Sequence, residues 1–174
     1  VRLLERSIYF KTDVVSMKQY LLRKDRVGVI AEIKRSSPST GELKNNLDIE
    51  KLSIGYMQAG ATALSVLTDQ KYFNGSNDDL TQARKFNYCP ILRKDFIIDE
   101  YQIYEAKSWG ADFILLIAAC LNPDEIAAFS NLAHQLNLEV LLEVHDKNEL
   151  LSAPMDNIDV VGVNNRNLKN FSES

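Results

Sequence analysis

The sequence predicts an α/β protein with a parallel sheet, and two observations carry this prediction. Short apolar runs recur along the chain, at residues 29–33, 63–67, 90–92, 113–119, 138–144 and 158–163. Each of the first five runs is followed by a segment of helical character, at Asp48–Gln58, Asp78–Phe86, Asp99–Trp109, Pro123–Leu136 and Lys147–Leu151. Strand and helix therefore alternate at the roughly thirty-residue period of a βαβ unit.

A third observation concerns the residues at the carboxyl ends of these apolar runs. Charged or amide side chains lie there, namely Glu32, Lys34, Lys94, Glu143, Asn164 and Arg166. In parallel α/β folds the active site is formed at the carboxyl ends of the strands. The sequence therefore predicts a polar site at one end of the sheet.

The first predicted strand shows this pattern most clearly. Ile30, Glu32 and Lys34 share one face of a strand of period two, whereas Ala31 and Ile33 lie on the other. Charged groups that point into a sheet or barrel interior are costly to desolvate, so they need each other, other polar groups or a ligand. We therefore interpret this strand end as part of a site.

The composition is typical of one soluble α/β domain, with 45% hydrophobic residues among 174. The chain has no apolar run near the roughly 20 residues that span a bilayer, and no signal-peptide pattern at its start. We expect a cytoplasmic protein without membrane contacts. The net charge of −4 argues against a general nucleic-acid surface and leaves room for a small anion in a local basic cleft.

The cysteines and histidines do not form a convincing metal set. Cys89 and Cys120 lack C-x-x-C spacing, and His134 and His145 are the two histidines. Cys120, near a predicted strand end, is better interpreted as a small apolar filler than as a nucleophile. His145 follows Glu143 on the same strand face and is a candidate for the rim of the site, although a structural role is the favoured alternative.

Five motifs in order now identify a family. They are A-E-I-K-R-S-S-P-S-T-G (31–41), S-V-L-T-D-Q-K-Y-F-N-G-S (65–76), I-L-R-K-D-F (91–96), L-L-E-V-H (141–145) and G-V-N-N-R-N-L (162–168). Together they resemble indole-3-glycerol-phosphate synthase from about residue 16 onward. The resemblance implies a (β/α)8 TIM barrel.

The resemblance also implies an enzyme of tryptophan biosynthesis, a carboxy-lyase acting on a phosphosugar. It would convert 1-(2-carboxyphenylamino)-1-deoxyribulose 5-phosphate into indole-3-glycerol phosphate, carbon dioxide and water. The chemistry requires an acid at the ribulose carbonyl, loss of the carboxylate and a proton-assisted dehydration. The family needs neither a metal nor an organic cofactor, and we expect none here.

Two of the family's acid/base groups match strand ends of this chain. Lys94 resembles the family's general acid. An ammonium held among apolar strand residues is suited to donate a proton to the carbonyl oxygen. The alternative for Lys94 is a surface lysine beside Asp95. Glu143 resembles the acid/base carboxylate of the fifth strand.

Three further catalytic positions follow from the same comparison. Lys34 is a candidate second acid for the dehydration, and Glu32 its positioning or basic partner. Asn164 matches an amide on the sixth strand that holds the sugar hydroxyls or Glu32. Sequence does not assign the two lysines to individual steps.

Substrate contacts are expected from the loops and the inner strand faces. Arg166 is expected to grip the substrate carboxylate with its bidentate guanidinium, and Ser37 offers a hydroxyl to the same group, with a plain turn serine as the alternative. The Ser-Pro-Ser-Thr-Gly stretch favours a mobile loop. Apolar walls for the anthranilate ring are expected from Phe73, Phe96, Leu115 and Leu168. For Leu115, barrel core is an equal alternative.

We expect residues 1–28 to form an N-terminal extension and residues 29–174 to form a partial barrel of about six βα units. Ser16 is expected to cap a short helix that runs to Leu22 and closes the barrel bottom or covers a flank. Because a complete barrel has eight strands and about 250 residues, with phosphate-binding loops after the last two, we expect the chain to be a fragment.

Alternatives to a synthase remain at this stage. Another phosphosugar barrel such as phosphoribosylanthranilate isomerase has a cysteine-bearing first strand, whereas this chain carries Glu32 and Lys34. The other alternative is a fragment that lacks activity and self-associates through its exposed edge strands. We expect the complete enzyme to be a monomer.

Overall fold

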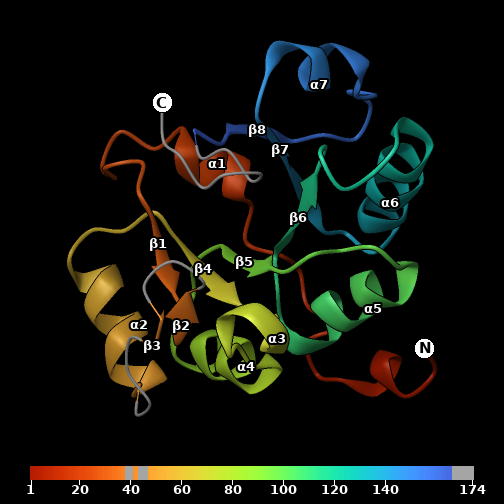
Figure 1. Cartoon of the computed structure of the whole chain (residues 1–174). Coiled ribbons are helices and arrows are strands. Elements are labelled where there is room, and N and C mark those ends of the chain that lie inside the picture. The colour runs from red at the N-terminus through yellow and green to blue at the C-terminus, as the bar shows by residue number, and fades with distance from the viewer. Residues whose placement is uncertain (38–40, 43–46, 166–174) are drawn as a thin grey trace.

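The computed structural model of the chain describes residues 1–37, 41–42 and 47–165 (Figure 1). The main sheet contains β1 (Ile30–Ile33), β4 (Ala63–Leu67), β5 (Ile91–Lys94), β6 (Phe113–Ile117), β7 (Glu139–Val144) and β8 (Val160–Val163). These strands lie in chain order, and each pairs with its neighbour in parallel. Figure 1 shows that the sheet curls as it passes from β1 to β8. The predicted incomplete barrel is therefore confirmed.

Helices connect the strands and lie around the outside of the curled sheet (Figure 1). They are α2 (Ile49–Gln58), α4 (Asn77–Phe86), α5 (Glu100–Trp109), α6 (Pro123–Gln135) and α7 (Lys147–Ser152). All five were expected from the sequence, within one residue at each end. Their starts are set by side-chain caps, among which Asp99 with Gln102 and Asn122 with Glu125 form capping boxes.

The two faces of the sheet pack against different partners. On the outer face Leu64, Leu116 and Leu142 belong to the core that lies under the helices. On the inner face Leu92 and Phe113 belong to a second, smaller core. Because side chains alternate across a strand, the inner positions at the carboxyl ends of the strands are left for other chemistry.

The N-terminal segment closes the amino ends of the strands. It contains a 3-10 turn, η1 (Leu4–Arg6), and α1 (Met17–Leu21), whose N-cap Ser16 accepts a hydrogen bond from the Gln19 amide as expected. Met17 is 1% exposed and packs into the inner core. The Ser16 hydroxyl donates to Glu139, the first residue of β7. Of the two placements considered from the sequence, the contacts therefore favour closure of the barrel bottom.

A buried aspartate ties this segment to the sheet. Asp112 precedes β6 and accepts hydrogen bonds from the Val15 amide and from the Ile91 amide at the start of β5, each at 2.7 Å. Arg84 of α4 pairs with the same carboxylate. Burial raises the pKa of Asp112 to about 6, although the Arg84 guanidinium acts in the opposite direction. The carboxyl group thus has partners on three different parts of the chain: the N-terminal segment, α4 and β5.

Asp159 makes similar contacts two βα units further along the chain. It precedes β8, accepts from the Val140 amide of β7 at 2.9 Å and contacts His134 Nε2 at 2.8 Å. The aspartate before one strand therefore holds the amino end of the strand before it.

Three short elements in the segments that follow β1 and β4 were not predicted. β2 (Ser36–Ser37) and β3 (Gly41–Glu42) form an antiparallel ladder in the stretch expected to be a mobile loop. α3 (Gln70–Phe73) follows β4 and is capped by Asp69. At Gly75, just beyond α3, an added Cβ would lie 2.3 Å from the Leu67 carbonyl oxygen, so the chain requires glycine where it passes the end of β4.

Within the described residues, no helix is long and apolar enough to cross a membrane.

Replacing Asp112 tests whether the amino-end network stabilises the fold. We expect Asp112→Ala to lower the free energy of unfolding by about 3–5 kcal/mol, because it leaves Arg84 and two backbone amides without their buried acceptor. Urea denaturation measures the change. The control is Asp156→Ala at an exposed loop position, where we expect a change within about 0.5 kcal/mol. Equal effects at the two positions would contradict this assignment.

Candidate active site

Three charged side chains meet on the inner face of the sheet at the ends of β1 and β5. Lys94 Nζ donates to Glu32 Oε2 at 2.6 Å, and Lys34 Nζ lies 2.9 Å from Glu32 Oε1. Their side chains are between 29% and 38% exposed. The cluster is therefore open to a ligand and still partly shielded from water.

The strand register explains why these residues meet. β4 lies between β1 and β5, with Ser65 beside Glu32 and Leu67 beside Lys94. The carboxylate and the ammonium therefore bridge two strands that do not pair with each other. Ser65 Oγ is buried within the described structure without a hydrogen-bond partner, and it shares the inner face with them.

The two lysines keep Glu32 ionised. Burial alone would raise the pKa of Glu32, but the ammonium groups of Lys94 and Lys34 outweigh it and hold the pKa below its usual value. One carboxylate thus fixes two ammonium groups, one on each of its oxygens.

The outer side of the same strand end is held by a second polar network. Arg93 is 4% exposed, and its guanidinium lies 4.5 Å from the centre of the Trp109 ring. It donates to Asp95 at 3.0 Å, and Asp95 also accepts from the Thr68 hydroxyl at 2.7 Å. Asp95 is thus bound to Arg93 and Thr68 while Lys94 is bound to Glu32. This argues against the alternative of Lys94 as a surface lysine beside Asp95.

A second polar cluster lies at the ends of β7 and β8. Asn164 Nδ2 donates to Glu143 Oε1 at 2.9 Å, and His145 Nε2 lies 3.9 Å from the same oxygen. The sequence had offered the sugar hydroxyls or Glu32 as the target of Asn164, and the structure places its amide on Glu143. Burial, followed by the nearby Glu143 and Glu149 carboxylates, raises the pKa of the Cys120 thiol, as befits a cysteine that is not an activated nucleophile.

The residues expected to contact the anthranilate ring differ in their surroundings. Phe96 is partly buried against the inner core and makes an edge contact with Tyr72, at 6.0 Å between ring centres. Phe73 ends α3 and is partly buried. Leu115 is 3% exposed and packs in the inner core, which favours the barrel-core alternative.

Three expected substrate contacts are not described by the structure. Arg166 and Leu168 lie outside the described residues. The backbone of Ser37 lies in β2, but its side chain is not described. These three remain predictions from the sequence.

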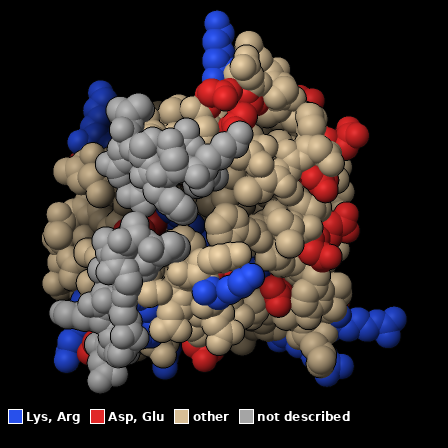
Figure 2. Space-filling model, viewed as in Figure 1, with Lys and Arg blue, Asp and Glu red and all other residues tan. Residues whose placement is uncertain are grey.

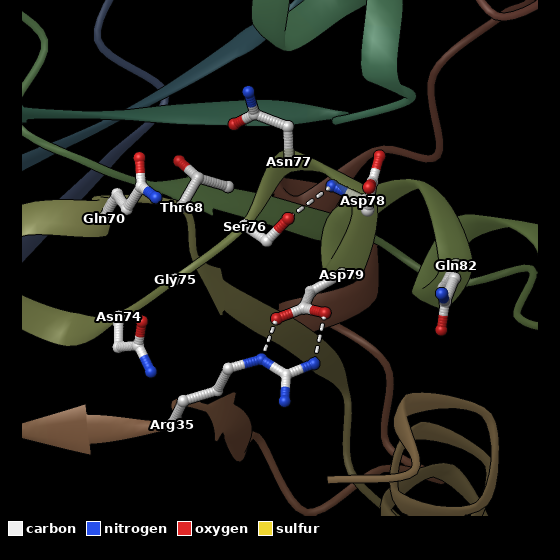
Figure 3. A pocket seen from close by; sticks show the side chains of 10 residues that line it. All are labelled: Arg35, Thr68, Gln70, Asn74, Gly75, Ser76, Asn77, Asp78, Asp79 and Gln82. Atoms are coloured by element: carbon white, nitrogen blue, oxygen red, sulfur yellow. Dashed lines mark hydrogen bonds and ion pairs between the residues drawn. The ribbon is translucent and has the colours of Figure 1, made fainter. Parts of the chain in front are cut away.

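A polar pocket of about 560 Å³ lies beside the carboxyl end of β4 (Figure 3). Figure 3 shows Arg35 reaching across it to Asp79, which it binds through two hydrogen bonds of 2.7 Å each. The pair ties the segment after β1 to the first turn of α4. None of the expected site residues lines this pocket within the described structure, and we interpret the pair as a support for the end of β1.

The visible face of the molecule carries charges of both signs (Figure 2). Acidic side chains gather along its right-hand edge, and lysines and arginines are spread around its periphery. In the part of the chain that the structure describes, no group of three or more His, Cys, Asp or Glu residues is placed to hold a metal ion.

Comparison with known proteins decides the family. The profile described as Indole-3-glycerol phosphate synthase matches residues 2–174. The chain belongs to this family. The indole-3-glycerol phosphate synthases of Neisseria meningitidis and Bacteroides thetaiotaomicron are 50% identical over 146 residues and 51% identical over 158 residues, which cover 84% and 90% of this chain. The resemblance inferred from the five motifs is confirmed.

The chain spans a little over half the length of these relatives, 56% of the Neisseria protein and 59% of the Bacteroides protein. Solved structures also match its fold. The carboxyl transferase domain of Rhizobium etli pyruvate carboxylase, bound to pyruvate and biocytin, superposes with a TM-score of 0.51 at 14% identity. The superposition covers 77% of this chain and 27% of that one, and at this identity it supports the fold alone.

Sequence reasoning missed two residues that the structure places beside the expected site residues. Ser65 faces inward beside Glu32, and the period-two pattern of its strand would have placed it there. Glu149, in the first turn of α7, contacts His145. No pattern in the sequence indicates that contact, because it depends on how the helix folds back over the end of β7.

Proposed function

We propose that the protein containing this chain is an indole-3-glycerol phosphate synthase. In the proposed reaction the aromatic carbon that bears the carboxylate attacks the ribulose carbonyl of 1-(2-carboxyphenylamino)-1-deoxyribulose 5-phosphate. Carbon dioxide and water then leave to give the indole ring. Family membership supports this, and the observation that carries it is the pairing of Lys94 with Glu32 on the inner face.

Ring closure needs a proton donor at the carbonyl oxygen. Negative charge develops on that oxygen as the new carbon–carbon bond forms, and the Lys94 ammonium neutralises it by donating a proton. Glu32 holds the ammonium 2.6 Å away, so the donor is oriented before the substrate arrives. We assign ring closure to Lys94 on this basis.

Dehydration needs a second donor, because hydroxide is a poor leaving group without protonation. Lys34 supplies a second ammonium on the other oxygen of Glu32, at 2.9 Å. The two donors share one carboxylate and therefore have a fixed relation to each other. We assign the dehydration step to Lys34.

Glu143 supplies a carboxylate at the end of β7, in the second polar cluster. We assign it to the anilino side of the substrate, where its carboxylate stabilises positive charge and accepts a proton. Asn164 holds one of its oxygens at 2.9 Å. Phe96 and Phe73 are the proposed contacts of the aromatic ring, and Arg166 and Ser37 those of the substrate carboxylate.

Replacing Lys94 tests the general-acid assignment. In the whole protein, we expect Lys94→Ala to lower kcat by about 10² to 10⁴ with the fold retained, because the variant has no positioned acid for the carbonyl oxygen. The fluorescence of the indole product follows turnover, and circular dichroism follows the fold. Lys85→Ala, at an exposed position on α4, is the matched control and should leave turnover unchanged. Turnover of Lys94→Ala within a few-fold of the parent would remove Lys94 from this role.

Glu143→Gln keeps the size of the side chain and removes its charge. We expect kcat to fall at least about tenfold, because an amide neither accepts the proton nor stabilises positive charge. The same fluorescence assay measures the loss, and an unchanged circular dichroism spectrum serves as the control. Full activity of the variant would make Glu143 a structural residue.

A further inference from the structure

His145 lies between two carboxylates at the end of β7. Its Nδ1 is 3.3 Å from Glu149 Oε2, and its backbone amide donates to that same oxygen at 2.7 Å. Its Nε2 is 3.9 Å from Glu143 Oε1. The imidazole thus connects α7 with the proposed catalytic carboxylate.

The contacts decide which ring nitrogens must carry a proton. The carboxylate of Glu149 accepts hydrogen bonds and does not donate them, so Nδ1 is the donor in that contact. A ring that also binds Glu143 must carry a second proton, on Nε2, because that carboxylate too only accepts; such a ring is the imidazolium. Nε2 is the atom that faces Glu143. It is buried and has no hydrogen-bond partner within the described structure, an arrangement that costs free energy unless a partner completes it.

Glu143 is the partner within reach. Asn164 already donates to its Oε1, the same oxygen that Nε2 faces. The distance of 3.9 Å is too long for a hydrogen bond. Contacts of this kind in catalytic sites often tighten only when a ligand binds. A small rotation of either side chain would bring the two atoms together.

We propose that His145 is a positioning residue for Glu143, with Glu149 fixing the ring through Nδ1 and the doubly protonated imidazolium donating from Nε2 to Oε1 in the liganded site. Oε1 would then be held from two sides, by His145 and Asn164, and Oε2 would be presented to the substrate. The inference rests on the proposed function, because it assigns His145 a part in the work of Glu143. A structural role for His145 would involve only its contact with Glu149.

Two substitutions in the whole protein separate these roles. His145→Gln places an amide near the position of Nε2 and keeps a donor toward Glu143. His145→Asn places its amide near Nδ1 and keeps only the Glu149 side. We expect His145→Asn to lower kcat at least about tenfold with KM within about twofold, and His145→Gln to retain kcat within about threefold.

The kcat values of His145→Asn and His145→Gln decide between the positioning role and a structural role. Equal kcat values for the two variants, whether reduced or unchanged, would overturn the proposal. The matched control is His134→Asn, at the other histidine of the chain, whose contact is with Asp159 at the opposite end of the sheet. We expect that variant to keep the parent kcat.

A second measurement does not depend on turnover. Selective ¹⁵N labelling of histidine reports on each ring nitrogen, and the resonances of His145 are assigned by their loss in His145→Gln. In the presence of the indole product analogue indole-3-propanol phosphate, we expect Glu143→Gln to shift the Nε2 resonance of His145 and Glu149→Gln to shift Nδ1. An Nε2 resonance unaffected by Glu143→Gln would overturn the proposal.

The two measurements also distinguish the two proposals. If the parent protein shows no synthase turnover but Nε2 responds to Glu143→Gln, the proposed function fails and the contact between His145 and Glu143 stands. If turnover is present and Nε2 does not respond, the role of His145 fails alone.

Discussion

The site depends on one ion pair that crosses the sheet. Lys94 on β5 and Glu32 on β1 are joined at 2.6 Å over the intervening strand β4. Because parallel strands bring their carboxyl ends to the same side, and because inner positions alternate with outer ones, only a curled sheet places these two side chains face to face. The order of the strands, their register and the curl are all needed to make this contact.

The ion pair is not the source of the fold's stability. Its side chains are about one-third exposed, and ion pairs of that kind contribute little to the free energy of folding. Stability comes from the two apolar cores and from the amino ends of the strands, where Asp112 and Asp159 each hold the start of a preceding strand. Contacts that stabilise the fold therefore lie at the amino ends of the strands, and the candidate site lies at their carboxyl ends, as in parallel barrels. Glu32, Lys34 and Lys94 at the carboxyl ends are partly exposed to water. The buried carboxylate of Asp112 at the amino ends requires its hydrogen-bond and ion-pair partners.

Much of this architecture could be predicted from local sequence patterns. Period-two patterning placed Glu32 and Lys34 on the same face of their strand, because a strand leaves only two directions for a side chain. Ser16 was expected to cap the short N-terminal helix and does so, because the first turn of a helix needs acceptors for its free amides.

What the sequence could not predict depends on contacts between distant segments. No pattern in the sequence singles out Asp112, because only the folded chain brings it to Val15, Ile91 and Arg84. The link from Glu149 through His145 to Glu143 arises in the same way. For Asn164 the sequence offered the sugar hydroxyls or Glu32 as its target, and the structure places its amide on Glu143, another carboxylate at a strand end, because β8 pairs with β7.

The most direct test of this account is a double-mutant cycle on kcat in the whole protein, with Glu32→Gln and Lys94→Ala. If Glu32 acts by holding the Lys94 ammonium, the fold-loss caused by Glu32→Gln should be at least several-fold smaller when Lys94 is already absent. The part of the loss that persists would belong to Lys34, the other partner of Glu32. An equal fold-loss from Glu32→Gln in both backgrounds would show that the two residues act independently and would contradict the account.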